Sequence, residues 1–201
     1  MIAKPNRYDE VEIMEFDYEP IILGGHKGII KNVEEYISAQ SGKKSLKVYV
    51  DMAGDDTQQN YFAYQYKNDT RPDKKWSNQA IKYVSLGEEE NQIRMLKGFL
   101  TAYENSNNCK FNWSGEWSQL ANKRIGLVFG LEEYYNQNNE LKTIVRLRDF
   151  RSIDKVENVK IPKVKLAEGT YVDYEEYVNV QKNQSDHTNP SVDDENYEFP
   201  F

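Results

Sequence analysis

The chain has 201 residues, of which 38% are hydrophobic, and this suffices for one domain of roughly 150 residues with appended segments. No apolar run reaches the roughly 18 residues of a membrane span, and the lone Cys109 excludes an internal disulfide. The first residues lack the apolar segment of a secretory signal, so we expect a cytoplasmic protein without a membrane partner.

The net charge of −7 is unevenly distributed along the chain. Residues 1–20 carry −4 and residues 167–201 carry −8, which leaves +5 for residues 21–166. We therefore divide the chain into an acidic N-terminal arm (1–20), a central domain (21–166) and an acidic, largely disordered C-terminal tail (167–201). A mildly basic domain is compatible with a polyanionic ligand but does not by itself indicate one.

The domain is predicted to begin with a strand over residues 22–37. Gly24, Gly25 and Gly28 lie inside this β-rich run, which indicates a bulge or sharp coiling of the strand. The glycines do not form a phosphate-binding loop, because they precede a strand and lack the Gly-Lys-Ser/Thr ending of that motif.

Two further strands are predicted over residues 46–51 and 60–67. In the first of these, apolar and polar side chains alternate, so Lys47 and Tyr49 face away from the core. The second is rich in aromatic side chains, some of which must be core. These aromatic residues are Tyr61, Phe62, Tyr64 and Tyr66.

Residues 68–84 are predicted to form a polar loop in which an aromatic ring lies among bases. The residues concerned are Arg71, Lys74, Lys75 and Trp76. Such a loop suits base stacking and phosphate contact. The alternative is that Trp76 folds back as a lid on the core.

One helix is predicted over residues 85–104, where Ser85 and Glu88 match a capping box. Apolar residues at helical spacing form a stripe that we assign to the core. The stripe contains Ile93, Met95, Leu96, Phe99, Leu100 and Tyr103.

A hairpin is predicted after the helix, with one strand from residue 123 toward 135 and another over 141–150. Lys142, Arg146 and Arg148 occupy even positions of the last strand, so alternation places these three cations on one face. They are either nucleic-acid contacts or a solvated outer face. An extended segment follows at 155–169, and the composition from Gln181 onward predicts a disordered linker.

Three strands, a helix and a hairpin predict a mainly β domain, a five-stranded OB-fold barrel with its helix between strands three and four. OB folds bind oligonucleotides on the face of strands two and three, where aromatic rings stack on bases and cations follow the phosphates. The candidate nucleic-acid-binding residues are Lys47, Tyr49, Tyr61, Tyr64, Arg71, Lys74, Lys75, Trp76, Lys142, Arg146 and Arg148.

Residues for catalysis are sparse. With two histidines and one cysteine, no zinc site of Cys and His ligands can form, and no nucleophile motif is present. Glu132 and Glu133 are paired carboxylates near the end of the fourth predicted strand, and they leave a Mg²⁺-dependent nuclease as an alternative. We otherwise expect no catalytic residue, no metal site and no cofactor.

Several short motifs between residues 21 and 166 resemble a family of OB-fold single-stranded DNA-binding proteins from phages of Gram-positive bacteria. The motifs are Gly25-His26 with Ile29, Ser41-Gly42-Lys43, Tyr61-Phe62, Glu104-Asn105-Ser106-Asn107, Phe111-x-Trp113, Phe129-Gly130-x-Glu132-Glu133-Tyr134, Arg151-Ser152 and Lys160-x-Pro162. The resemblance implies an OB fold and single-stranded DNA binding in phage replication or recombination. It does not assign individual binding residues.

The C-terminal residues form an acidic run that ends in aromatic side chains and a proline. The residues are Asp193, Asp194, Glu195, Glu198, Phe199, Pro200 and Phe201. This ending resembles the tip of bacterial single-stranded DNA-binding proteins, and it suits capture in an apolar pocket with a basic rim. We therefore expect single-stranded DNA and replication or recombination proteins as partners. The alternatives are an ordinary acidic terminus and a protein-interaction module that binds no DNA, and a homo-oligomer is left open.

Overall fold

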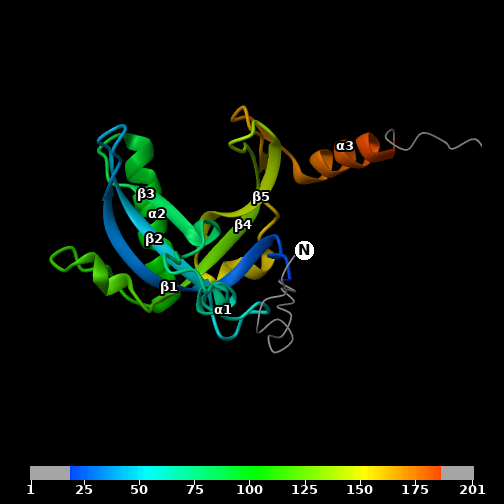
Figure 1. The fold of residues 1–201 in the computed structure, drawn as a ribbon. Helices are drawn as coiled ribbons and strands as arrows, with labels where there is room; N and C mark the ends of the chain where they lie inside the picture. The colour runs from blue at the N-terminus through cyan, green and yellow to red at the C-terminus, as the bar shows by residue number, and fades with distance from the viewer. Residues whose placement is uncertain (1–18, 187–201) are drawn as a thin grey trace, which may run out of the picture.

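One mixed sheet of seven strands organises residues 19–186, the part of the chain that this computed structural model describes (Figure 1). The predicted N-terminal arm, apart from residues 19 and 20, and the acidic Asp193–Phe201 ending lie outside the described residues. The strands are β1 (Gly24–Ile37), β2 (Lys44–Met52), β3 (Ile81–Ser85), β4 (Arg124–Tyr135), β5 (Leu141–Arg151), β6 (Val164–Lys165) and β7 (Tyr171–Val172). The helices are α1 (Tyr61–Asn68), α2 (Glu90–Asn107) and α3 (Tyr174–Asp186), with 3₁₀ turns η1 (Asn78–Ala80), η2 (Trp117–Leu120) and η3 (Ile153–Asn158).

The long strand β1 lies at the centre of the sheet, in the order β3-β2-β1-β4-β6-β7. The pairs β1–β2, β2–β3, β1–β4 and β4–β5 are all antiparallel. Strand β5 also pairs with β4, whereas β6 pairs in parallel with β4 at Glu132. The mainly β class predicted from the sequence is therefore confirmed, as an open sheet of seven strands.

Strand β2 forms as its alternating sequence predicts. Leu46, Val48 and Val50 are completely buried, whereas Lys47 and Tyr49 lie on the opposite face. Alternate side chains of a strand point to opposite faces, so one short run supplies both a core layer and an accessible surface. The predicted hairpin is also present, with β4 and β5 joined by a loop at residues 136–140.

The third predicted strand is wrong, because residues 61–68 form helix α1. The buried carboxylate of Asp51 accepts hydrogen bonds from the backbone N–H groups of Phe62 (2.9 Å) and Ala63 (3.2 Å), and so caps the first turn of the helix. Phe62 then enters the core at 1% exposure. A tertiary cap thus outweighs the strand preference of an aromatic run. The edge strand next to β2 is instead β3, inside the segment predicted as a loop.

Helix α2 begins and ends later than predicted, and its capping box uses Glu89 and Gln92 rather than Ser85 and Glu88. Only the second half of its apolar stripe is core. Ile93 remains 51% exposed and Met95 47% exposed, which corrects the assignment of the whole stripe to the core. The reason is that the buried positions of α2 lie between residues 99 and 103, whereas in the first half of the helix only Leu96 packs against the core among the described residues.

The glycines of β1 permit close approach by other segments. A Cβ atom on Gly25 would lie 1.9 Å from the carbonyl oxygen of Val156 in η3, and one on Gly28 would lie 2.4 Å from the side chain of Leu127. The irregular register of β1 against β2 occurs later, between Ile30 and Asn32. The predicted bulge therefore exists in this strand, but the glycines themselves serve packing.

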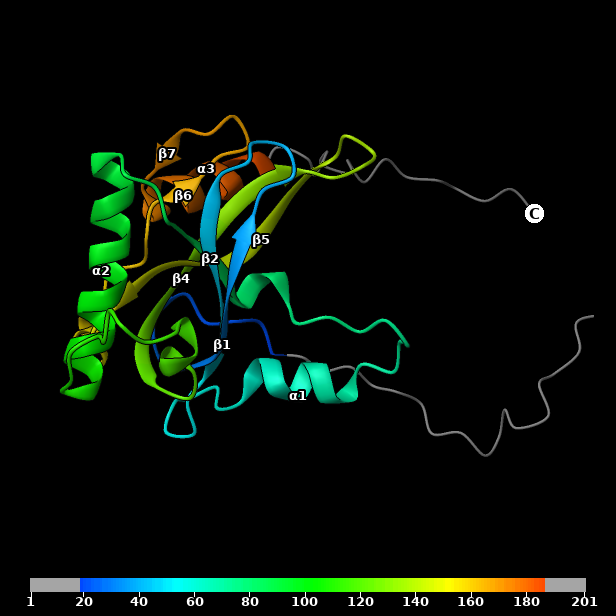
Figure 2. The same ribbon diagram turned by 90° about the vertical axis from the view of Figure 1, so that its left-hand side faces the viewer.

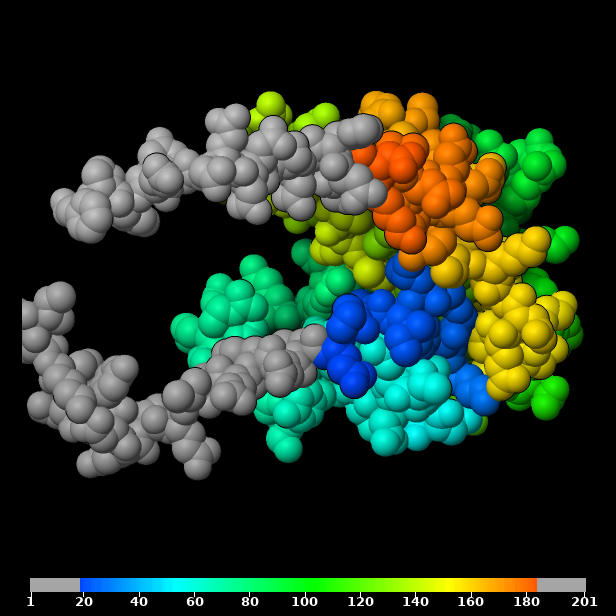
Figure 3. Space-filling view, turned by 90° about the vertical axis from the view of Figure 1, so that its right-hand side faces the viewer, coloured from blue at the N-terminus to red at the C-terminus, as the bar shows by residue number. Residues whose placement is uncertain are grey.

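The segment after β5 packs back on the sheet. Residues of η3 and β6 cover β4, and α3 docks through the Tyr177 hydroxyl, which donates to Glu133 Oε1 at 2.9 Å. Figure 3 shows η3 (yellow) beside β7 and α3 (orange to red) on one face, next to the start of β1 (blue). Helix α3 continues to Asp186, so the disordered linker predicted from Gln181 does not begin there.

Candidate nucleic-acid interface

Three tyrosines and a lysine gather on the outer side of β1, β2 and β3. The register places Lys47 of β2 between Glu34 of β1 and Tyr83 of β3. The Lys47 ammonium lies 4.8 Å from the centre of the Tyr49 ring and 3.6 Å from the Glu34 carboxylate. We call the surface made by Tyr36, Lys47, Tyr49 and Tyr83 the β2–β3 face.

The rings of the β2–β3 face remain accessible. Tyr36 and Tyr83 lie with ring centres 5.2 Å apart, and Tyr83 is 45% exposed. The Tyr49 hydroxyl donates a hydrogen bond to Glu34. Two neighbouring rings beside a cation offer both components of single-strand recognition, a π surface for bases and a positive charge for phosphate.

The electrostatics of the β2–β3 face keep its cation charged. The hydrogen bond with Tyr49 is the main cause that raises the pKa of Lys47 above 10.5. Burial raises the pKa of Tyr49, and its bond to Glu34 adds to this effect. At neutral pH the face therefore presents the Lys47 ammonium group, beside the Glu34 carboxylate, and the neutral phenol of Tyr49.

The predicted residues of segment 61–76 form a separate group around α1. Trp76 donates its indole N–H to the carbonyl of Val50 at 3.0 Å and packs against the core, as the lid alternative expects. Its ring centre lies 5.7 Å from that of Tyr66, and the Lys74 ammonium lies 4.7 Å from the Tyr66 ring. Tyr61 is partly buried and donates its hydroxyl hydrogen to the backbone carbonyl of Glu19 at 2.7 Å.

The remaining predicted residues of this segment are surface groups. Arg71 contacts the Asp69 carboxylate with two guanidinium nitrogens, and this bond is the main cause that lowers the pKa of Asp69 to about 2. Lys75 and Tyr64 are exposed. Figure 2 shows α1 and the loop after it projecting away from the sheet.

The cations of β5 lie on another part of the sheet, where they surround a carboxylate. Glu132 of β4 contacts Lys165 at 2.8 Å and Arg148 at 3.5 Å. Burial opposes ionisation of Glu132, but the hydrogen bond with Lys165 and the charges of Lys165, Arg146 and Arg148 together lower its pKa. Arg146 Nε is buried without a hydrogen-bond partner among the described residues. Lys142 pairs with Glu140 near the hairpin loop.

The two free edges of the first five strands are held together by side chains. The Lys82 ammonium on β3 donates to the Arg148 carbonyl on β5 at 2.6 Å, and the Gln79 amide donates to the Val145 carbonyl at 3.0 Å. Within the described chain, β3 and β5 share no backbone ladder. The β1–β2 and β4–β5 hairpins point to the same side of the molecule, the top in Figures 1 and 2.

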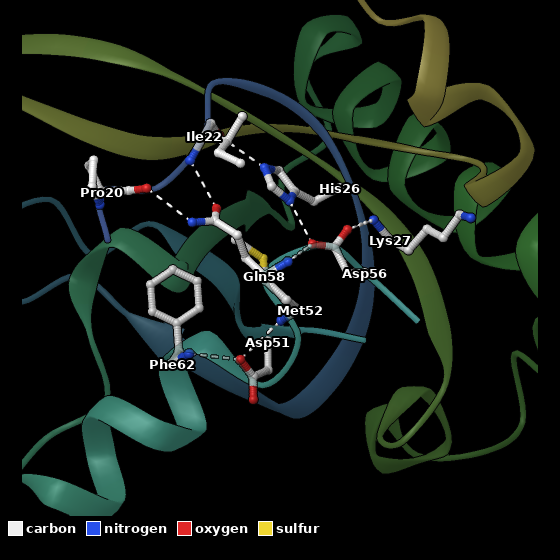
Figure 4. Close-up of polar contacts among 9 residues, drawn as sticks. All are labelled: Pro20, Ile22, His26, Lys27, Asp51, Met52, Asp56, Gln58 and Phe62. Carbon is white, nitrogen blue, oxygen red and sulfur yellow. Dashed lines mark hydrogen bonds and ion pairs between the residues drawn. The ribbon is translucent and has the colours of Figure 1, made fainter. Parts of the chain in front are cut away.

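His26 belongs to a buried structural cluster (Figure 4). Its Nδ1 lies 2.9 Å from the Asp56 carboxylate, and its Nε2 lies 2.9 Å from the carbonyl oxygen of Ile22. Asp56 also accepts from the backbone N–H groups of Lys27 and Gln58. Both imidazole nitrogens are therefore engaged, and the bond to Asp56 joins the start of β1 to the turn after β2.

The carboxylate pair that suggested a nuclease is not a pair in space. Glu132 and Glu133 are adjacent on β4, so their side chains point to opposite faces, and they contact Lys165 and Tyr177 respectively. Among residues 19–186 no group of three or more His, Cys, Asp or Glu side chains could hold a metal ion. The described helices include none that is both long and apolar enough to cross a membrane.

An apolar groove of about 350 Å³ lies between α2 and the loop after it. Ile93, Leu96 and Leu100 form its helical side, and Phe111 and Trp113 form the other. The two rings meet edge to face with centres 5.0 Å apart, and Trp113 is largely exposed.

Sequence reasoning placed Lys47 and Tyr49 correctly on an accessible strand face but missed Tyr36 and Tyr83 beside them. The short run at 81–85 contains the signal for Tyr83, because Val84 is apolar and buried between the more accessible Tyr83 and Ser85. No protein-family profile matches the chain, and no curated protein matches it at a significant level.

Proposed function

We propose that this protein binds single-stranded DNA without strong sequence preference. The observation that carries the proposal is the β2–β3 face, where the Lys47 ammonium lies over the Tyr49 ring and opposite Tyr83, whose ring contacts that of Tyr36. Aromatic stacking is tolerant of base identity because every base has a π face, and the cation can neutralise a phosphate. The role in phage replication or recombination rests on the resemblance of the sequence motifs.

The strand order supports an OB-type barrel for the first five strands. An OB fold is a partly open five-stranded barrel that binds oligonucleotides on strands two and three and on the loops of its two hairpins. Here β3-β2-β1-β4 and β5 follow one another, α2 lies between β3 and β4, and side chains bridge β3 to β5. In this arrangement the β2–β3 face is the expected ligand face, and the two hairpins flank it.

A salt titration tests the proposal. Contacts to about four phosphates should give a slope of log K against log salt near −3, at about 0.7 per phosphate for single strands. The measurement is the fluorescence anisotropy of labelled oligothymidine titrated with the protein at several salt concentrations. Absence of binding at low salt, or equal affinity for single-stranded and double-stranded DNA, would contradict the proposal.

The acidic ending is assigned to partner capture rather than to DNA. Its carboxylates compete with phosphates for the basic domain, and its aromatic residues suit an apolar pocket on a replication or recombination protein. Removing residues 193–201 should therefore leave DNA affinity unchanged or slightly higher and abolish binding to that partner. Fluorescence titration of the truncated chain measures the first effect, and a fall in DNA affinity would refute the assignment.

The apolar groove on α2 favours a second candidate function, a protein-interaction module that binds no DNA. Apolar grooves with exposed aromatic rings are typical of protein contacts. The salt titration separates the candidates, because only the DNA-binding function predicts salt-sensitive oligonucleotide binding.

A further inference from the structure

A second basic surface lies at the end of β5, outside the β2–β3 face. A cavity of about 340 Å³ opens between β5, the segment at 159–163 and β7. Arg148, Arg151, Lys160 and Lys163 line it, and Asp149 is its only lining carboxylate. Four cations from residues 148–163 therefore lie around one concave site.

The cations of this cavity remain available to a ligand. Arg151 pairs with Asp149 at 2.6 Å and Lys163 pairs with Asp173 at 3.3 Å, but the side chains of both pairs are substantially exposed. Arg148 is 16% exposed and contacts Glu132, so it forms the inner wall of the cavity. Exposed ion pairs contribute about 0–1 kcal/mol, so a phosphate can replace either carboxylate at little cost. Lys160 is exposed and has no ion-pair partner among the described residues.

An aromatic ring completes the cavity. Tyr171 of β7 is 55% exposed, and the Arg148 guanidinium lies 5.5 Å from the centre of its ring. Pro162 and Val159 add apolar lining. A ring, an apolar wall and several cations match the base and phosphate of a nucleotide better than they match a bare inorganic anion.

The cavity lies where β5 approaches β3. Lys82 of β3 bonds to the backbone carbonyl of Arg148, whose side chain lines the cavity. The outer side of β3 carries Tyr83. Strand β5 lies beside β3, to which it is joined by side-chain hydrogen bonds such as that of Lys82. A strand leaving the β2–β3 face past Tyr83 would therefore meet the cavity next.

We propose that this cavity binds a nucleotide unit of the single strand, with phosphate oxygens at Arg151, Lys160 and Lys163 and the base on Tyr171. The proposal rests on the proposed function and extends its footprint from the β2–β3 face around the edge of the sheet to β5.

The test compares two oligothymidines on the full-length chain, one of about 6 nucleotides and one of about 16, which lie near the lower and the upper end of the usual site size of an OB fold. The double variant Lys160→Gln/Lys163→Gln should lose about tenfold in affinity for the longer oligonucleotide and keep its affinity for the shorter one. Its salt slope should fall by about 1.4, which corresponds to two phosphate contacts. Tyr171→Ala should lower affinity for the longer oligonucleotide without this change in slope.

Lys155→Gln is the matched control, because Lys155 is an exposed lysine of η3 that does not line the cavity. Unchanged affinity of the double variant, or an equal loss in the control, would overturn the proposal while the proposed function stands. A titration with thymidine triphosphate forms the second arm. Binding of the free nucleotide that the double variant loses, without an effect on the longer oligonucleotide, would overturn the extended strand path. Absence of oligonucleotide binding by the unaltered chain would overturn both proposals.

Discussion

Replacing Tyr83 by alanine is expected to weaken single-stranded DNA binding by roughly 5- to 150-fold, since base stacking on an aromatic ring contributes about 1–3 kcal/mol. Tyr83 is accessible, lies opposite Lys47 and contacts the Tyr36 ring, so its loss removes a stacking surface at the centre of the β2–β3 face. Fluorescence titration with oligothymidine measures the change. The salt slope should remain constant, because no phosphate contact is removed.

Two further variants separate stacking from other causes. Tyr83→Phe keeps the ring and should retain most of the affinity. Trp113→Ala removes another exposed ring, on the loop after α2, and should leave DNA binding unchanged. A large loss in Trp113→Ala, or wild-type affinity in Tyr83→Ala, would place the DNA elsewhere on the molecule.

The Asp56→Ala variant is expected to lose roughly 3–5 kcal/mol of unfolding free energy, the range found when one partner of a buried ion pair is removed. The side chains of His26 and Asp56 are only 2% and 6% exposed, so water cannot replace the missing carboxylate. The backbone N–H groups of Lys27 and Gln58 also lose their acceptor. Urea unfolding measures the effect, and Lys155→Ala on the surface is the control.

The same pair should make stability depend on pH. Burial is the largest influence on His26 and opposes protonation, but the hydrogen bonds to Asp56 and to the Ile22 carbonyl, with the charge of Asp56, raise its pKa above 6.5. Burial likewise opposes ionisation of Asp56, yet its bonds to His26 and to backbone N–H groups lower its pKa below 3.8. The contribution of His26 to the free energy of unfolding is therefore complete below pH 6.5 and is lost as pH rises through the pKa of the folded state. The contribution of Asp56 is complete above pH 3.8 and is lost as pH falls through its folded-state pKa.

Unfolding free energies of the unaltered chain should therefore fall as pH rises through and above 6.5. The His26→Gln variant should be less stable at pH 6 and should lose most of this dependence. An equal decline in both proteins would assign the pH effect to other groups.

The sequence alone determined those elements in which the alternation of apolar and polar side chains matches the surroundings that the fold provides. Strand β2 formed because its alternation supplies Leu46, Val48 and Val50 to the core, and this alone placed Lys47 and Tyr49 on the accessible side. The β4–β5 hairpin formed for a similar reason, since polar residues between two apolar runs favour a turn. The separation of acidic ends from a basic centre is also a property of the sequence alone.

Tertiary contacts decided the elements whose pattern was ambiguous. Residues 61–68 became helix α1 because Asp51, distant in sequence from the helix interior, accepts its first N–H groups and Phe62 fills the core. That helix removed Tyr61 and Tyr64 from the strand face and left the position beside β2 to β3, which brought Tyr83 there.

The contacts of the β5 cations also depend on tertiary structure and could not be predicted from the sequence. Alternation placed Arg146 and Arg148 on one face, but it could not reveal that Arg148 contacts the Glu132 carboxylate, which Lys165 of β6 also contacts. It also could not reveal that the chain returns after β5 to enclose a basic cavity with Tyr171. Periodicity in sequence reports which side of an element is apolar, whereas the partners of its polar side depend on segments that only folding brings near.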